Sequence, residues 1–438
     1  MVFSPPAAHR YWITRASLYA AITQGEGLAP ARADGFVTAA LLVEDGRIVR
    51  IMPEAEEDGA PRFDIAGKII LPRLIDIHTH LDKGHIFPRA ANPDGSFMGA
   101  LTTVMADREK NWSAEDVAAR MDFALRCAYH HGTGAIRTHL DSYRALTAST
   151  WGVFDAMREA WKDRISLQVV ALFPTIVAVE DEAEFKNTLA HVARYNGILG
   201  GVTFRGNPPD AALELALDRT IEAAKAHGLD LDFHVDESAS PDARSLEVIA
   251  DALLRHHFTG KVLAGHCCSL ALMADEDRTR VTDKLGEAGV AVVSLPMCNL
   301  YLQDREAGRT PRWRGVAPLH ELDAAGVATM VSSDNTRDPF YAYGDLDGVE
   351  VYREATRILH FDHSARPWLE AITSRPADHM RLTGGGRLMP GMAADFIVFS
   401  ARNMNEFLAR PQQDRQVFRA GMPLAAPLPD YAELDGLY

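Results

Sequence analysis

The middle of the chain alternates short apolar runs with amphipathic segments. Eight apolar runs rich in β-branched residues lie between residues 74 and 334, and after one longer gap they begin about 30 residues apart, the length of a βα unit. Near-continuous apolar strands separated by helices indicate a parallel sheet covered on both faces. We therefore expect an α/β protein with a (β/α)8 TIM barrel. The expected strands are 75–80, 135–141, 167–174, 200–206, 229–237, 261–268, 290–296 and 327–334.

The segments between these runs carry helix start and stop signals. Ser113 precedes two acidic residues, as an N-cap does, and Gly132 follows the end of the apolar period. The stretches 181–195 and 211–227 have the same form. The pattern therefore predicts helices between the strands.

Both ends of the chain are strand-like instead. An apolar run at 36–43, an Asp-Gly pair and a second run at 47–51 are typical of a β-hairpin. Further strand candidates lie at 68–71, 394–399 and 417–421. Two β segments that flank a barrel suggest one satellite domain, a small β-sandwich built from both chain termini.

This pattern divides the chain into three parts. Residues 1–71 are expected to form the first part of the β-sandwich, 72–383 the metal-dependent barrel, and 384–438 the second part of the sandwich with a tail. The residues after about Pro423 are expected to be a loose tail.

Composition narrows the function classes. Of 438 residues, 47% are apolar and 24% are charged, which is typical of a soluble globular protein. The net charge of −15 and the lack of a basic cluster argue against nucleic acid or an anionic membrane as partner. No apolar run approaches the roughly 20 residues of a membrane span, and residues 1–12 lack the apolar core of a signal peptide.

The cysteines indicate a reducing, cytoplasmic setting. There are four, none of them in a Cys-x-x-Cys pair, so neither a disulfide framework nor a Cys-based zinc site is expected. We expect buried, reduced thiols at Cys127, Cys267, Cys268 and Cys298.

Residues able to bind a metal gather at the expected strand ends. His78 and His80 are two residues apart at the end of the first strand, so their side chains point to the same side. His234 ends the fifth strand, His266 the sixth and Asp334 the eighth. A single strand-end histidine is more often structural, but five such residues at the C-terminal strand ends, where TIM barrels build their active sites, predict a metal site.

The donor types narrow the metal and its chemistry. Imidazoles with one carboxylate suit Zn2+ or Fe2+ rather than Ca2+ or Mg2+. Glu237 follows His234 by three residues and is expected to shuttle protons, the alternative being an ordinary surface glutamate. Asp236 is expected to orient its neighbours.

In these residues the chain resembles the amidohydrolase superfamily and, within it, the cytosine deaminase branch. The resemblance spans nearly the whole chain. The motifs that carry it are His-Thr-His-Leu-Asp at 78–82, Arg-Thr-His-Leu-Asp at 137–141, His-Val-Asp-Glu at 234–237, Asp334 with Asp-Pro-Phe-Tyr at 338–341, and Leu-Met-Pro-Gly-Met-Ala-Ala-Asp at 388–395.

The resemblance implies a hydrolytic deaminase of a small nitrogen heterocycle, cytosine or a related pyrimidine or amidine ring. Metal-bound hydroxide would attack the C–NH2 carbon and release ammonia. His266 would hydrogen-bond the hydroxide, Glu237 would protonate the ring nitrogen, and Asp334 would pass a proton to the departing amine. The expected metal ligands are His78, His80, His234 and Asp334, and a homo-oligomer is also implied.

The expected fourth strand contains no Lys. Two-metal members of the superfamily usually carry a carboxylated Lys there, so the resemblance implies one divalent ion.

Three positions depart from the cytosine deaminase pattern and are expected to contact the substrate. Thr175 stands where a Gln binds the pyrimidine edge, Asn335 where a second Asp is common, and Phe340 where Trp is usual. Cytosine, isocytosine-like rings, pterins, triazines and cyclic guanidines therefore all stay open as substrates. Lys83, His85 and Arg205 could line the mouth of the site or be structural.

Two other hypotheses compete with the deaminase hypothesis. One is an amidohydrolase that releases an alkylamine, as from an N-isopropylammelide-type triazine, or that cleaves a cyclic amide. The other is a non-catalytic binding protein on an enzyme fold, which the complete ligand set with Glu237 argues against.

Overall fold

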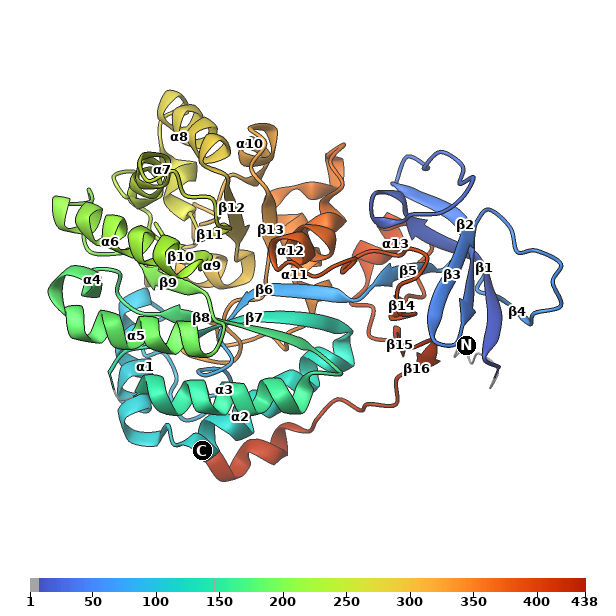
Figure 1. Ribbon diagram of the computed structural model, residues 1–438, viewed down its shortest axis with the longest axis horizontal. Coiled ribbons are helices and arrows are strands. Elements are labelled where there is room, and N and C mark those ends of the chain that lie inside the picture. Colours follow the sequence, from blue (N-terminus) through green and yellow to red (C-terminus); the bar gives the residue numbers. More distant parts are fainter. Residues whose placement is uncertain (1–7, 145) are drawn as a thin grey trace.

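The eight apolar runs form eight strands in the computed structural model, which describes residues 8–144 and 146–438 (Figure 1). Every observed strand overlaps its expected range, so the predicted alternation of strands and helices is confirmed. The strands are β6 (Leu74–Thr79), β7 (Thr133–Asp141), β8 (Ser166–Leu172), β9 (Leu199–Val202), β10 (Leu231–Val235), β11 (Val262–His266), β12 (Val290–Ser294) and β13 (Thr329–Val331).

These strands form two parallel sheets. One has the order β6-β7-β8 and the other β13-β12-β11-β10-β9. Isolated parallel bridges join the two sheets. Val170 of β8 pairs with Ile198 before β9, Pro174 after β8 pairs with Val202 of β9, and Thr79 of β6 pairs with Asp334 after β13. The α/β class with parallel sheets is confirmed, and a closed barrel stays a prediction.

Helices connect the strands, and the expected start and stop signals are confirmed. The Ser113 hydroxyl accepts a hydrogen bond from the Asp116 N–H, and Gly132 takes the left-handed conformation (φ 98°) that ends the helix. The helices are α1 (Phe97–Asn111), α2 (Ala114–His131), α3 (Leu146–Trp161), α4 (Val177–Glu180), α5 (Glu182–Arg194), α6 (Ala211–His227), α7 (Ser245–Arg255), α8 (Asp275–Ala288), α9 (Pro296–Leu302), α10 (Leu319–Ala324), α11 (Gly348–Leu359), α12 (Ser374–His379) and α13 (Met404–Ala409).

Strands from both ends of the chain join one eight-stranded sheet, to one side of the parallel sheets in Figure 1. The expected hairpin around the Asp-Gly pair is confirmed, and β5 pairs antiparallel with β14, which links the two ends of the chain. The strands are β1 (Arg10–Tyr19), β2 (Phe36–Glu44), β3 (Arg47–Met52), β4 (Arg62–Asp64), β5 (Ile69–Pro72), β14 (Phe396–Val398), β15 (Gln416–Arg419) and β16 (Met422–Pro423).

The expectation of a loose tail after Pro423 is wrong. Tyr431–Leu437 form a 3-10 helix, η5, that begins with a capping box. Leu434 is 2% exposed and packs in a small cluster with Phe123 of α2, and the last turn accepts a hydrogen bond from Arg89. The buried Leu434 side chain and the capping box hold the segment in place.

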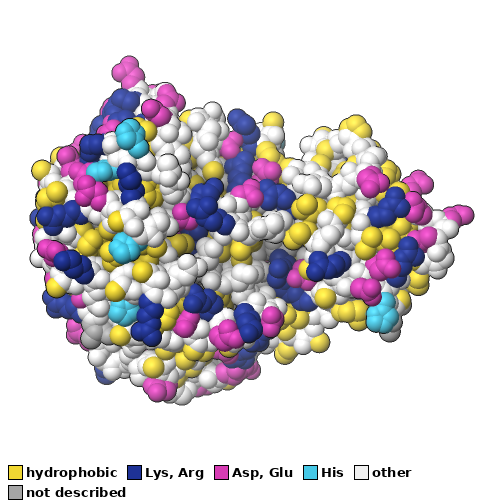
Figure 2. All heavy atoms as spheres, in the orientation of Figure 1, with side chains coloured by type: hydrophobic (Ala, Val, Ile, Leu, Met, Phe, Trp, Pro, Cys, Tyr) yellow, Lys and Arg dark blue, Asp and Glu magenta, His cyan; other side chains and the backbone are white. Residues whose placement is uncertain are grey.

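The state of the cysteines and the distribution of surface charge match what the composition predicts. All four cysteines are free and buried, as expected. On the face drawn in Figure 2, basic and acidic side chains are interspersed rather than gathered in one basic patch. Within the described residues, no helix combines the length and the apolar character needed to cross a bilayer. The expectation about a signal peptide rests in part on residues 1–7, which lie outside the described residues.

We predict that Leu434→Ala destabilises the protein by about 2–3 kcal/mol, because it removes a buried side chain and leaves a cavity. The measurement is the midpoint of urea unfolding. Leu428→Ala, at a side chain that is 44% exposed, is the matched control and should leave the midpoint unchanged. Equal midpoints for all three proteins would contradict the packing of η5 on α2.

Candidate metal centre

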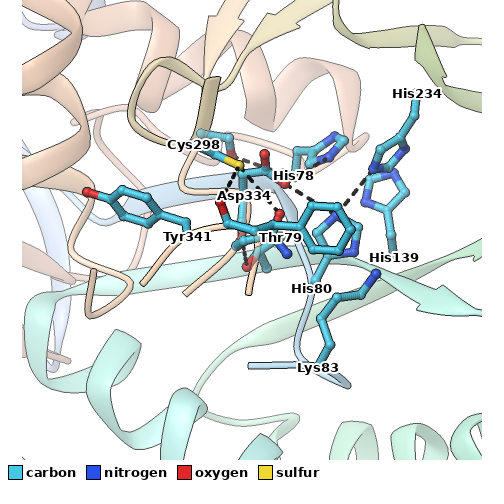
Figure 3. A network of polar contacts seen from close by, with 12 residues as sticks. His78, Thr79, His80, Lys83, His139, His234, Cys298, Asp334 and Tyr341 are labelled. Atoms are coloured by element: carbon cyan, nitrogen blue, oxygen red, sulfur yellow. Dashed lines mark hydrogen bonds and ion pairs between the residues drawn. The ribbon is translucent and has the colours of Figure 1, made fainter. Parts of the chain in front are cut away.

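The expected metal ligands meet at the C-terminal ends of three strands (Figure 3). His80 Nε2 lies 3.3 Å from Asp334 Oδ1, and His78 Nε2 lies 3.6 Å from the same oxygen. His234 Nε2 lies 3.2 Å from His80 Nε2. Residues that are more than 250 positions apart in the sequence, roughly the span from β6 to β13, are thus neighbours at one site.

These separations fit a single ion. Ligand atoms placed tetrahedrally about 2.1 Å from a Zn2+ lie about 3.4 Å from one another. His78 Nε2 and both oxygens of Asp334 are buried and have no hydrogen-bond partner. Buried polar atoms without partners cost free energy, which a bound cation would recover. Three imidazoles and a carboxylate therefore fit one divalent ion.

Burial keeps the imidazoles in the neutral form that binds metal. Burial and then repulsion by neighbouring histidines lower the pKa values of His78 and His234 well below the ordinary range. Burial and then the charge of Lys83 do the same to the pKa of His80. Burial raises the pKa of Asp334 to about 7. The ligands therefore bind a cation without first losing protons from the histidines.

Strand β6 is fastened to the segment after β13 directly beside the ligands. The buried Asp76 carboxylate accepts hydrogen bonds from the hydroxyls of Ser332 and Ser333, both at 2.5 Å. The N–H of Asp334 donates to the carbonyl of His78 at 2.9 Å. These bonds fix the first-strand histidines relative to the aspartate.

Glu237 and His266 lie against the cluster and share one partner. The Asn299 amide on α9 donates to Glu237 Oε1 at 3.0 Å and contacts His266 Nδ1 at 2.9 Å. Because an amide nitrogen only donates, His266 accepts at Nδ1 and carries its proton on Nε2, which has no partner. His266 Nδ1 is also 4.0 Å from Asp334 Oδ2.

His139 on β7 belongs to the cluster, although it was not expected as a site residue. One nitrogen each of His78, His80 and His139 lie within 4.8 Å of one another. His139 Nε2 contacts the buried carboxylate of Asp232 at 3.1 Å, and Arg137 donates to the same carboxylate at 3.0 Å. The Arg-Thr-His-Leu-Asp motif was the signal for it, because Arg137 and His139 share one face of the strand.

Asp236 orients the backbone, as expected of it. Its carboxylate accepts hydrogen bonds from the N–H groups of Ser245 and Leu246, at 3.0 and 2.9 Å. It therefore holds the start of α7 rather than a substrate.

The three expected substrate contacts have different surroundings. Thr175 is fully buried after β8, and its hydroxyl has no partner. Asn335 donates to Asp338 at 2.7 Å and accepts from the Cys298 thiol, so its amide is engaged by the protein. The Phe340 ring packs edge-on against Phe97.

The three residues considered for the mouth of the site lie in three different environments. The Lys83 ammonium contacts Asp141 at 3.0 Å and lies 5.7 Å from the centre of the Phe340 ring. His85 is buried, and neither of its nitrogens has a partner. Arg205 pairs with Glu180 and Asp210, which are more than half exposed. Lys83 alone of the three is thus placed beside the expected site residues.

The chain is similar to a known family and to several known proteins. The model of the amidohydrolase family matches residues 124–422. Pterin deaminase of Rhizobium rhizogenes strain K84 is 51% identical over 433 residues, 99% of this chain and 98% of the relative. N-isopropylammelide isopropyl amidohydrolase of Pseudomonas sp. strain ADP is 24% identical, over 81% and 85% of the two chains. The structure of 5-methylcytosine deaminase from Klebsiella pneumoniae matches with a TM-score of 0.77 and 22% identity, over 96% of this chain and 98% of that one.

We predict that His234→Ala lowers the bound divalent metal at least tenfold, because it removes one of four converging ligand atoms. Metal per chain, measured by mass spectrometry after dialysis, checks this. His363→Ala, at a side chain that is 95% exposed, is the control and should retain the metal. Full metal content in the His234 variant would refute the ligand assignment.

Proposed function

This chain belongs to the amidohydrolase family, and on that premise we propose that it is a metal-dependent deaminase of a 2-amino-4-oxo heterocycle of the pterin type. Its relatives hydrolyse carbon–nitrogen bonds of cyclic amidines, and so does this enzyme. The reaction converts a ring C–NH2 and water into a ring C=O and ammonia. The observation that carries the proposal is Glu237, an acid whose side chain is 13% exposed and which Asn299 holds beside the ligand cluster.

The cluster would hold one divalent ion, Zn2+ or Fe2+. Imidazole nitrogens with one carboxylate suit both metals. When bound, such an ion lowers the pKa of a water molecule to about 7 and supplies hydroxide at neutral pH. The ligands would be His78, His80, His234 and Asp334.

Glu237 would deliver the proton that makes the ring electrophilic. Burial and then the charge of Asp334 raise the pKa of Glu237 well above its ordinary range, which favours the protonated carboxyl. The carbon of a C–NH2 group is a poor electrophile until the adjacent ring nitrogen is protonated. Asn299 holds Glu237 Oε1 in place for that transfer.

Asp334 and His266 would complete the proton path. Asp334 lies against His78 and His80, and its carboxylate would take a proton from the attacking water and pass it to the departing amine. Burial and then repulsion by His139 lower the pKa of His266 to about 3, so it stays neutral. Its Nε2–H would donate to the attacking oxygen.

A pterin is favoured over cytosine by two arguments. The pterin deaminase relative is 51% identical over nearly the whole chain, whereas the 5-methylcytosine deaminase structure is 22% identical. Thr175 is too short to make the two-point contact of the Gln found in cytosine deaminases. Around the ring, Thr175, Asn335 and Phe340 would form the walls.

The parallel strands that position the site are also expected to close into a barrel. We infer that β6–β13 act as one closed (β/α)8 barrel, because isolated bridges join the two parallel sheets at both ends of the strand order. We also infer the division into residues 1–71, 72–383 and 384–438, and the support for it is that strands from both ends of the chain share one sheet.

We predict that Glu237→Gln lowers kcat for ammonia release from pterin by about 100- to 1000-fold, because the amide cannot supply the proton. Metal content should stay unchanged. A coupled ammonia assay checks the rate.

Glu276→Gln, at an exposed glutamate on α8, is the matched control and should keep full activity. If the Glu237 variant releases ammonia at the wild-type rate, Glu237 is not the proton shuttle. If the wild type releases isopropylamine from N-isopropylammelide and no ammonia from pterin, the alkylamine-releasing reaction replaces the deaminase proposal.

A further inference from the structure

Lys83 is a buried cation near the metal-ligand cluster. It follows His80 by three residues, is 5% exposed, and its ammonium lies 5.7 Å from the centre of the Phe340 ring. Figure 3 shows its side chain directed toward the imidazoles of His80 and His139. The ammonium thus borders both the ligand cluster and the aromatic wall.

The ammonium has more donors than the protein uses. Among the described residues, Asp141 Oδ1 at 3.0 Å is the one hydrogen-bond acceptor of Lys83. An ammonium group carries three N–H donors. Two donors therefore remain for a ligand or for water in a site that is almost closed to solvent.

Lys83 is one of two cations that pair with Asp141. Arg108 on α1 donates to the other oxygen, Oδ2, at 2.9 Å. The nearby carboxylate of Asp82 accepts the main-chain N–H of Asp141 at 2.8 Å. Asp141 is thus shared by two cations, one on each oxygen. It holds the Lys83 ammonium in place and occupies only one of its N–H donors.

Lys83 keeps its charge in this environment. Burial lowers its pKa, but attraction by Asp141 and Asp82 outweighs burial, so the pKa lies above the ordinary value.

We propose that Lys83 is a specificity-determining residue that donates hydrogen bonds to an oxo oxygen on the heterocycle, which selects 4-oxo rings over 4-amino rings. This inference rests on the proposed deaminase function and names the substrate edge that the site reads. An ammonium only donates, so it pairs with an acceptor and opposes an amino group at the same position. In 2-amino-4-oxopteridine, O4 and the neighbouring ring nitrogen N5 are both acceptors on one edge.

The test pairs a side-chain change with a substrate change. Ammonia release from pterin and from 2-aminopteridine, which lacks the 4-oxo group, is measured for the wild type and Lys83→Met. We expect kcat/KM on pterin to fall about 100-fold or more, and kcat/KM on 2-aminopteridine to fall less than threefold. Such non-additivity is the mark of a direct contact.

Two controls separate recognition from folding. Arg108→Met removes the other cation on Asp141 and should change kcat/KM on pterin less than threefold, with equal metal content and melting temperature in all variants. If Lys83→Met does not fold, the wild type still tests the idea. It should then favour pterin over 2,4-diaminopteridine by at least 100-fold.

The outcomes are distinct. Equal losses on both substrates, or wild-type rates on 2,4-diaminopteridine close to those on pterin, overturn the role of Lys83 and leave the deaminase proposal standing. Failure of the wild type to release ammonia from any 2-amino ring overturns both.

Discussion

The site depends on one constraint. Ligand atoms without hydrogen-bond partners converge where the first parallel strand, β6, pairs with the segment after the last one, β13. His78 and His80 belong to β6 and its end, and Asp334 follows β13, so the three meet only where these strands are joined. Asp76 and its serine partners fasten this joint. A cation bound there would offset the cost of burying the ligand atoms, so metal binding and the stability of the strand ends are linked.

The same burial sorts the protons among the groups of the site. Burial disfavours charged forms, so it lowers the pKa values of the histidines and raises the pKa of Glu237. Lys83 escapes this rule because Asp141 compensates it. Burial thus favours neutral histidines and a protonated Glu237, whereas neighbouring carboxylates favour the charged form of Lys83.

The sequence was informative where a regular period or a strand-end position carried the signal. The eight parallel strands and the meeting of His78, His80, His234 and Asp334 were predictable, because a strand's C-terminal end is readable from the apolar pattern. Asn299 was not, since it comes from a short helix, α9, and acts through two residues distant in sequence. The packing of η5 on α2 was hidden for a similar reason, because one buried leucine, Leu434, in an irregular segment has no period.

The departures from the cytosine deaminase pattern take on physical meaning in the structure. Asn335 has both ends of its amide engaged, by Asp338 and by the Cys298 thiol, so it shapes the loop after β13 and has little capacity left for a ring edge. Thr175 offers one hydroxyl. The strongest uncommitted donors near the ligands therefore belong to Lys83, which lies on the loop that leaves the metal-binding strand. Recognition by a charged donor rather than by a side-chain amide favours rings that present acceptors, and this is the chemical difference between a 4-oxo pteridine edge and an amino-bearing one.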